Sequence, residues 1–138
     1  MREACPERIL LVEDEGDIAE VLKTRLESLG YDVHTEPYGA TALSYAIGHH
    51  PDLVILDVRL PDMGGYDVCQ ELRHSFSRTD MPVLMFTVKD GPIDDILGFA
   101  SGANGYLTKR CAIADLFRAV ADLLRDSTAE IHEAVPAF

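Results

Sequence analysis

The sequence predicts an α/β fold in which helices cover both faces of a doubly wound parallel sheet, and three observations support that prediction. Four short apolar runs are bounded by polar or turn residues, and three of these runs are continuous, as in strands that are buried on both faces. The segments between the runs have the periodicity of amphipathic helices. Strands and helices alternate strictly with short connections, which implies right-handed crossovers.

Five segments are predicted to be strands, at residues 9–12, 31–35, 53–56, 83–86 and 106–107. The second of these alternates polar and apolar side chains, so we expect it at an edge of the sheet. Five helices are predicted around the apolar positions within residues 18–29, 43–47, 68–76, 93–100 and 113–124. Gly30 is expected to cap the first helix, Pro51 follows the second, and Gly98 interrupts the pattern of the fourth.

The length of 138 residues is enough for one domain with its own core. We expect this domain to span residues 7–126. Residues 127–138 are expected to form a C-terminal tail or an extension of the last helix. This organisation fits both a stand-alone protein and one domain of a longer chain.

Acidic residues outnumber basic ones, with 24 Asp and Glu against 12 Lys and Arg, and the formal net charge is −12. This excess argues against nucleic-acid binding by the domain, because phosphate backbones attract Lys and Arg. No apolar stretch has the roughly 18 residues that a membrane span needs, and the N-terminus has no signal-peptide pattern. We therefore expect a cytoplasmic protein that does not enter a membrane.

Polar side chains follow four of the predicted strands. Glu13 and Asp14 follow the first strand, Asp57 the third, Thr87 the fourth and Lys109 the fifth. Taken alone, each has an ordinary explanation, since acids cap helices, Thr favours strands and Lys is usually solvated. Because ligands bind beyond the carboxyl ends of the strands in an open α/β sheet, their collection at one edge favours a functional site.

Three carboxylates that lie together repel one another unless a cation lies among them. Oxygen ligands in small number favour Mg²⁺, with Mn²⁺ as the alternative ion. A divalent cation and the ammonium of Lys109 suit phosphoryl transfer, in which they hold phosphoryl oxygens during an in-line attack. Asp57 is the best candidate nucleophile, since a carboxylate can form an aspartyl-phosphate.

Four sequence segments, in this order and spacing, resemble one family. They are ILLVEDE, PDLVILDVRLPDMGG, PVLMFTV and GANGYLTK. Together they are similar to the receiver domain of two-component response regulators, over about residues 7–126. The resemblance implies a flavodoxin-like fold, with five parallel strands in the order 2-1-3-4-5 and five helices.

The resemblance also implies roles for the acidic residues. Asp57 corresponds to the phosphoacceptor, and Asp14 to a direct ligand of Mg²⁺. Glu13 is expected to act on the ion through water, and the backbone carbonyl of Arg59 to complete the protein ligands together with Asp57. The phosphoryl donor is then a sensor histidine kinase or a histidine phosphotransfer protein.

Three further residues correspond to the switch. Lys109 would pair with the phosphoryl group, Thr87 would hydrogen-bond to it, and Tyr106 would turn inward when Thr87 moves. The face formed by the fourth helix, fifth strand and fifth helix would report the change to a downstream protein or a fused output domain. We expect a signalling switch that catalyses only its own phosphorylation and dephosphorylation.

The sequence departs from the family at several positions. The lysine is usually followed by proline, but Arg110 follows Lys109, and a cis bond to a residue other than proline costs about 3–4 kcal/mol. We therefore expect a trans or visibly strained bond between them. Val88 occupies a position that is usually Ala or Gly. We interpret Val88, Arg59 and Lys89 as modulating residues, and we expect Val88 and Arg59 to slow hydrolysis of the phosphorylated form. The alternative is that Val88 and Arg59 point into solvent.

Receivers of one class form a charged symmetric dimer through arginines of the fifth helix. This chain lacks arginines at the corresponding residues 119–121, and the nearest ones are Arg118 and Arg125. We therefore do not expect that dimer.

Two other functions stay open. A Mg²⁺-dependent aspartyl-phosphate hydrolase usually has a second acid where this chain has Arg59, and a phosphorylation-independent pseudo-receiver usually lacks part of the acid, hydroxyl and lysine set.

Overall fold

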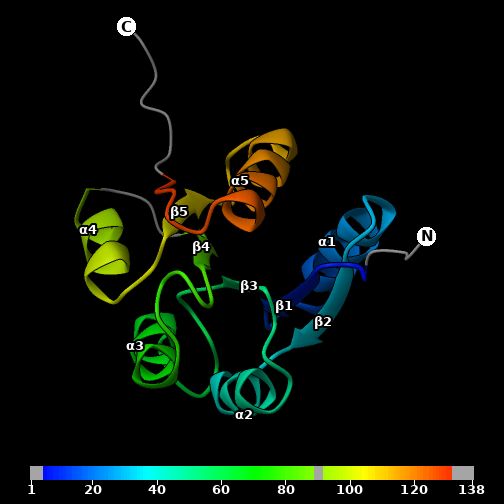
Figure 1. Cartoon of the computed structure of the whole chain (residues 1–138). Helices are drawn as coiled ribbons and strands as arrows, with labels where there is room; N and C mark the ends of the chain where they lie inside the picture. The colour runs from blue at the N-terminus through cyan, green and yellow to red at the C-terminus, as the bar shows by residue number, and fades with distance from the viewer. Residues whose placement is uncertain (1–4, 89–91, 132–138) are drawn as a thin grey trace, which may run out of the picture.

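The structure is a computed structural model that describes residues 5–88 and 92–131. Within these residues, five strands alternate with five helices along the chain (Figure 1). The strands are β1 (Arg8–Val12), β2 (Asp32–Glu36), β3 (Leu53–Leu56), β4 (Val83–Thr87) and β5 (Gly105–Thr108). The helices are α1 (Gly16–Ser28), α2 (Gly39–His49), α3 (Gly65–Ser75), α4 (Pro92–Ala100) and α5 (Ile113–Arg125).

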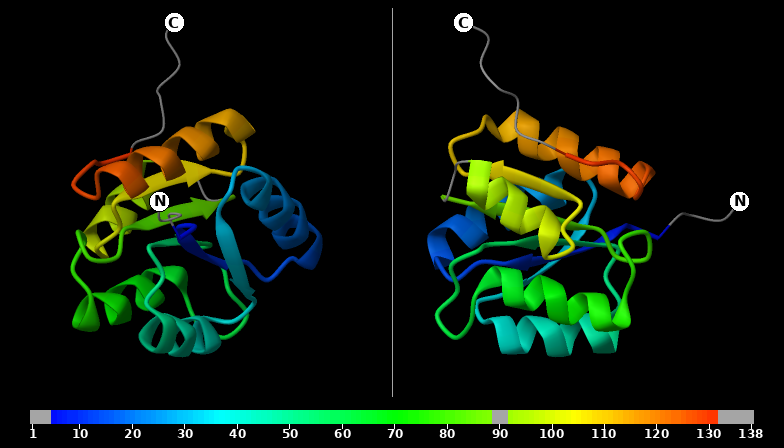
Figure 2. Two further views of the ribbon diagram at one scale, coloured as in Figure 1. Left: turned by 45° about the vertical axis from the view of Figure 1, so that its right-hand side comes forward. Right: turned by 90° about the vertical axis from the view of Figure 1, so that its left-hand side faces the viewer.

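All neighbouring strands in the sheet are parallel, and their order is β2-β1-β3-β4-β5. The predicted fold class and strand order are therefore confirmed. The central strand β3 is buried along its whole length, whereas β2 at the edge is mostly half-buried, as its alternating sequence predicted. Figures 1 and 2 show helices on both faces of the sheet.

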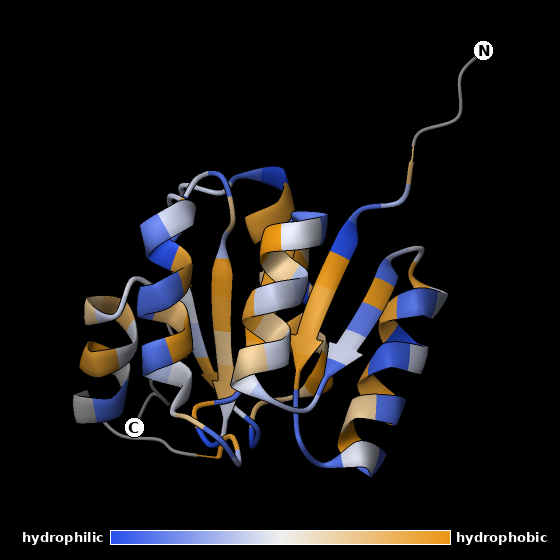
Figure 3. Ribbon diagram, turned by 90° about the horizontal axis from the view of Figure 1, so that it is seen from below, coloured by the Kyte–Doolittle hydropathy of each residue, from blue (hydrophilic) through white to orange (hydrophobic). Residues whose placement is uncertain are grey.

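Alternate residues of each strand enter two separate apolar layers. In β1, Ile9 and Leu11 pack under α1 and α5, whereas Leu10 and Val12 face α2 and α3. Figure 3 shows the consequence, with apolar strands at the centre and helices whose apolar sides turn inward. The continuous apolar runs in the sequence arise because both faces of the sheet are covered.

Two glycines explain where the helices end or continue. Gly30 follows α1 with a positive φ of 100°, a conformation that favours glycine, and this matches its predicted capping position. Gly98 lies inside α4, and a Cβ there would come within 2.8 Å of Cδ2 of Tyr106. Helix α4 continues through Gly98, and the absence of a side chain there leaves room for the ring of Tyr106.

Arg73 of α3 joins two loops through its guanidinium group. It donates hydrogen bonds to the carbonyl oxygens of Gly102 and Met81, both at 2.8 Å, and to Oδ1 of Asn104 at 3.0 Å. Asn104 is itself buried, and its Oδ1 also accepts a hydrogen bond from the amide of Val83. These contacts fix the starts of β4 and β5 relative to the end of α3.

Helix α5 ends at Arg125, and the described residues that follow, 126–131, do not extend it. The chain turns back, and Ile131 pairs in parallel with Gly105 at the outer edge of β5. None of the helices in the described part of the chain combines the length and the apolar character of a membrane-spanning segment.

Candidate functional site

Three carboxylates meet at the carboxyl ends of β1 and β3, as the sequence predicted. Glu13 and Asp14 follow β1, Asp57 follows β3, and each offers a carboxylate oxygen within 4.8 Å of the others. Glu13 and Asp57 are buried, being only 4% and 5% exposed, whereas Asp14 is exposed. The cluster is thus open to solvent on the side of Asp14.

Backbone hydrogen bonds place the two buried acids. The amide of Glu13 donates to the carbonyl oxygen of Glu36, and the amide of Asp57 donates to that of Val12, both at 3.1 Å. Each acid therefore continues the hydrogen-bond pattern of the sheet for one residue beyond its strand. The proximity of the two carboxylates follows directly from the order of β2, β1 and β3.

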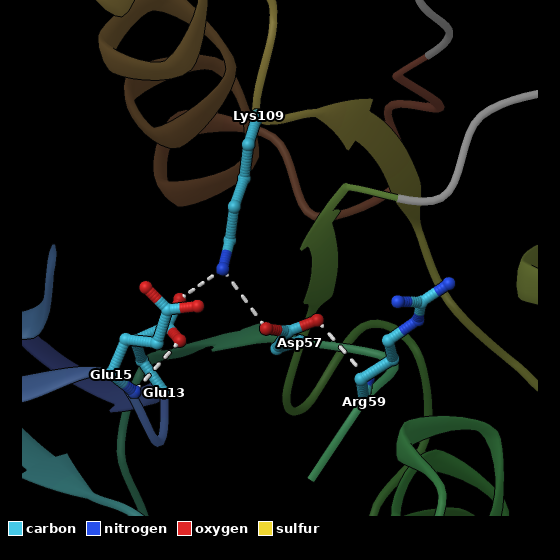
Figure 4. Close-up of polar contacts among 5 residues, drawn as sticks. All are labelled: Glu13, Glu15, Asp57, Arg59 and Lys109. Carbon is cyan, nitrogen blue, oxygen red and sulfur yellow. Dashed lines mark hydrogen bonds and ion pairs between the residues drawn. The ribbon is translucent and has the colours of Figure 1, made fainter.

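Lys109 lies between the two buried carboxylates (Figure 4). Its Nζ is 2.5 Å from Oε1 of Glu13 and 2.9 Å from Oδ2 of Asp57. The backbone amide of Lys109 donates to the carbonyl oxygen of Thr87 at 2.7 Å, which holds the residue directly after β5. One ammonium group thus partly balances two adjacent anions.

The electrostatics of the pair reflect burial and hydrogen bonding. Burial raises the pKa of Glu13 above its ordinary value, and the opposing hydrogen bond from Lys109 does not cancel this effect. Burial alone would lower the pKa of Lys109, but its hydrogen bonds to Glu13 and Asp57 outweigh burial and raise that pKa. The lysine therefore remains charged at neutral pH.

Backbone amides donate to the other carboxylate oxygen of each buried acid. The amide of Arg59 donates to Oδ1 of Asp57 at 3.1 Å, and the amide of Glu15 donates to Oε2 of Glu13 at 3.2 Å. Figure 4 shows the guanidinium of Arg59 pointing away from Asp57. Val88 is half-exposed, and Lys89 lies outside the described residues.

The loop after Asp57 requires a glycine at position 65. The sequence motif contains this glycine, but the motif alone does not show why it is needed. A Cβ at Gly65 would lie 2.2 Å from the carbonyl oxygen of Asp57 and 2.7 Å from Cα of Val58. In the same loop, Asp62 accepts hydrogen bonds from the first amides of α2, at Gly39 and Ala40, and these bonds lower its pKa. The two ends of the loop thus lie against each other at Asp57 and Gly65, and Asp62 holds its middle to α2.

Thr87 is the last residue of β4, and Tyr106 lies within β5. Thr87 is fully buried and pairs with Thr108 across the sheet. The ring of Tyr106 is buried among the apolar residues under α3 and α4, next to Gly98. Burial raises the pKa of the neighbouring Tyr66, although a hydrogen bond with Tyr106 opposes that effect. Tyr106 thus takes the inward position in this structure.

The bond from Lys109 to Arg110 is trans, as predicted, like the other peptide bonds of the described residues. Beside Lys109 lies an apolar hollow of about 390 Å³ between α1 and the start of α5. Its wall includes Val21, Cys111 and Ile113. This hollow was not predictable from the sequence, because its lining comes from segments far apart in the chain.

Comparisons with known proteins agree with this geometry. The family described as "Response regulator receiver domain" matches residues 9–121. A probable transcriptional regulator ycf27 from Porphyridium aerugineum is 40% identical over 119 residues, which cover 86% of this chain and 48% of that protein. The DNA-binding dual master transcriptional regulator RpaA of Synechocystis sp. is 40% identical over 118 residues, covering 86% of this chain and 49% of that protein. The chain spans about half the length of these relatives.

Solved structures show the same likeness. The BeF3-activated N-terminal receiver domain of Klebsiella pneumoniae RstA superposes with a TM-score of 0.82 at 30% identity, covering 87% of this chain and all of that one (100%). A CheY-like receiver domain protein from Methanospirillum hungatei gives a TM-score of 0.82 at 25% identity, with 88% and 96% covered. With its sheet order, its acidic cluster and the match over most of its length, the chain belongs to the family of response regulator receiver domains.

Proposed function

We propose that Asp57 accepts a phosphoryl group from a phosphohistidine of a sensor histidine kinase or a histidine phosphotransfer protein. The observation that supports this most directly is that the buried carboxylate of Asp57 pairs with the ammonium group of Lys109 within a cluster of three carboxylates. In the transfer, a carboxylate oxygen of Asp57 forms a bond to phosphorus while the P–N bond to the donor histidine breaks. The histidine nitrogen takes up a proton.

The donor set fits a hard divalent cation, Mg²⁺ or alternatively Mn²⁺. The carboxylates of Asp14 and Asp57 and the backbone carbonyl of Arg59 would hold the ion, and Glu13 would reach it through water. Their oxygen atoms are the ligands that such ions prefer, and the exposure of Asp14 leaves room for bound water. When bound, the ion neutralises charge on the phosphoryl oxygens.

Lys109 serves the transfer by changing partners. It now neutralises Asp57 and Glu13, and a phosphoryl group on Asp57 would present new anionic oxygens within reach of the same ammonium. Thr87, buried at the end of β4, would donate its hydroxyl hydrogen to one of these oxygens. Tyr106 would then be held inward, and the face of α4, β5 and α5 would carry the signal.

The chain is proposed to act as a cytoplasmic signalling switch and not as a metabolic enzyme, since it transfers the phosphoryl group only to itself and then to water. The similar proteins RpaA and ycf27 are named as transcriptional regulators and are about twice as long. We infer that the output acts on transcription through a fused domain or a separate downstream protein, and that this domain itself binds no nucleic acid.

Incubation with acetyl phosphate and Mg²⁺, followed by intact-mass measurement, tests the proposal. We expect a gain of one phosphoryl group that Asp57→Asn abolishes and that Asp80→Asn, a change at an exposed acid, leaves in place. Rapid release of inorganic phosphate from small phosphate esters would instead support an aspartyl-phosphate hydrolase. The absence of any mass gain would support a phosphorylation-independent pseudo-receiver.

A further inference from the structure

The chain reverses direction directly after α5. The carboxylate of Asp126 accepts hydrogen bonds from the amide of Thr128 at 3.0 Å and from its hydroxyl at 2.6 Å, and the amide of Ala129 donates to the carbonyl of Asp126 at 3.0 Å. These short-range bonds form a compact turn. The turn brings residues 127–131, which we call the strap, alongside β5 (Figure 1).

The strap pairs with the outer edge of β5 through backbone hydrogen bonds. The amide of Ile131 donates to the carbonyl of Asn104 at 2.9 Å, and the amide of Tyr106 donates to the carbonyl of Ile131 at 3.0 Å. Without the strap, this edge of the sheet would present unpaired backbone groups. The strap therefore occupies the position of a sixth, parallel strand.

Side chains make this edge a shaped site for an extended segment. A Cβ at Gly105 would come within 2.6 Å of Cβ of Ile131, so the glycine gives the space that isoleucine fills. Ile131 and Ala129, two residues apart, both pack against the apolar layer under α5. The buried Asn104 donates from Nδ2 to the carbonyl of Ser127 at 3.0 Å, which holds the start of the strap.

We propose that the outer edge of β5 is a strand-binding site, occupied in the free chain by the strap, and that a partner binds here by adding an extended segment after displacing it. The fit at Gly105 defines the partner's chemistry: a parallel strand with a small residue and, two positions later, a β-branched aliphatic one. The strap spans only five residues, 127–131, and a partner strand of this chemistry can replace its backbone hydrogen bonds to β5. This inference does not depend on phosphorylation of Asp57.

Amide hydrogen exchange followed by NMR tests whether the strap closes the site. In the unmodified chain, we expect the amide of Tyr106 to be protected. Ile131→Asp removes the apolar anchor and should speed exchange of that amide roughly tenfold or more. Ile131→Val, the conservative control, should retain the protection. The amide of Lys109, which bonds to Thr87 on the opposite side of β5, should stay protected in all three proteins and so serves as an internal control.

A capped peptide with the sequence of residues 126–131 tests whether the edge binds a strand. Added to the Ile131→Asp chain, it should restore protection of the Tyr106 amide, and the same peptide with Asp as its last residue should not. In the unmodified chain the tethered strap competes with the peptide, so binding there should need a peptide concentration about tenfold higher or more.

Fast exchange of Tyr106 in the unmodified chain would overturn the proposal, as would unchanged exchange in Ile131→Asp or failure of the peptide to protect that variant. If Ile131→Asp also exposed the Lys109 amide, Ile131→Gly would provide the same comparison without a buried charge. Asp57→Asn should give the unmodified result, which separates this inference from the proposed phosphorylation.

Discussion

Lys109 is the single residue on which the balance of charge at the site depends. It lies within hydrogen-bonding distance of both buried carboxylates, and its side chain is only 12% exposed. Removing it would leave Glu13 and Asp57 facing each other without a cation. The lysine therefore stabilises the fold in the absence of metal, as well as serving the proposed transfer.

We predict that Lys109→Ala lowers the free energy of unfolding by about 1–3 kcal/mol in metal-free buffer, because adjacent anions lose their common partner. Lys23→Ala, a change on α1, is the matched control and should alter stability by less than about 0.5 kcal/mol. Urea unfolding in the presence of EDTA measures both. Equal effects of the two substitutions would contradict the role given to Lys109.

The raised pKa of Glu13 gives a pH dependence with a definite sign. Because the folded chain holds this proton more tightly than the unfolded chain, the contribution of Glu13 is most favourable below its ordinary pKa of 4.5. It declines as the pH rises from that value through the raised pKa of the folded state. We predict that Glu13→Gln removes this decline. As the pH rises above 4.5, the wild type should therefore lose stability relative to the variant. Metal-free unfolding curves across this range measure the shift, and parallel curves would contradict it.

At the scale of elements, the loop between β3 and α3 has no space for a side chain at Gly65. We predict that Gly65→Ala destabilises the protein by about 1–3 kcal/mol or more and lowers phosphoryl uptake, because a Cβ would push against the carbonyl of Asp57. Gly48→Ala is the matched control on α2, where no atom outside the adjoining residues and the backbone of the helix itself lies within 4 Å of the added Cβ. It should stabilise by about 0.5–1 kcal/mol. Denaturant unfolding compares the two, and similar losses would refute the packing argument.

Helix α4 offers a second element-scale test. Gly98→Ala improves helix propensity but places a Cβ against the ring of Tyr106. We predict that the ring leaves its buried position while Asp57 keeps its ability to be phosphorylated, since the substitution lies outside the acidic cluster. NMR shifts of the Tyr106 ring measure the change. A ring that stays buried in the variant would show that α4 moves instead.

The elements themselves were largely predictable from the sequence. Continuous apolar runs identified β1, β3 and β4, and their polar continuations identified Glu13, Asp14 and Asp57, because the periodicity of a sequence records which side chains are buried. The contacts of Arg73 with carbonyl oxygens of distant loops were not predictable, since no local pattern encodes them. The pairing of the strap with β5 was missed for a similar reason: its sequence, STAEI, is mostly polar.

At the scale of the whole molecule, binding of the proposed Mg²⁺ at the acidic cluster would be coupled to folding. A ligand that binds only the folded state at about 100 times its dissociation constant adds about 2.7 kcal/mol to stability. We predict that Mg²⁺ raises the midpoint of thermal unfolding, that Asp14→Asn largely abolishes the increase, and that Asp17→Asn, a neighbouring exposed acid in α1, retains it. Thermal scans with and without Mg²⁺ measure this, and an equal loss in both variants would point to general charge screening.

The strand order also has a consequence for the chain as it leaves the ribosome. β1 and β2 emerge first and pair with each other. β3 then covers the free edge of β1, β4 covers that of β3, and β5 covers that of β4. Until β5 emerges, the sequence VLMFT of β4 is an uncovered apolar edge, the kind of segment that aggregates. This edge of β4 is thus exposed during the interval between the emergence of Thr87 and that of Thr108, and the strap later covers the outer edge of β5.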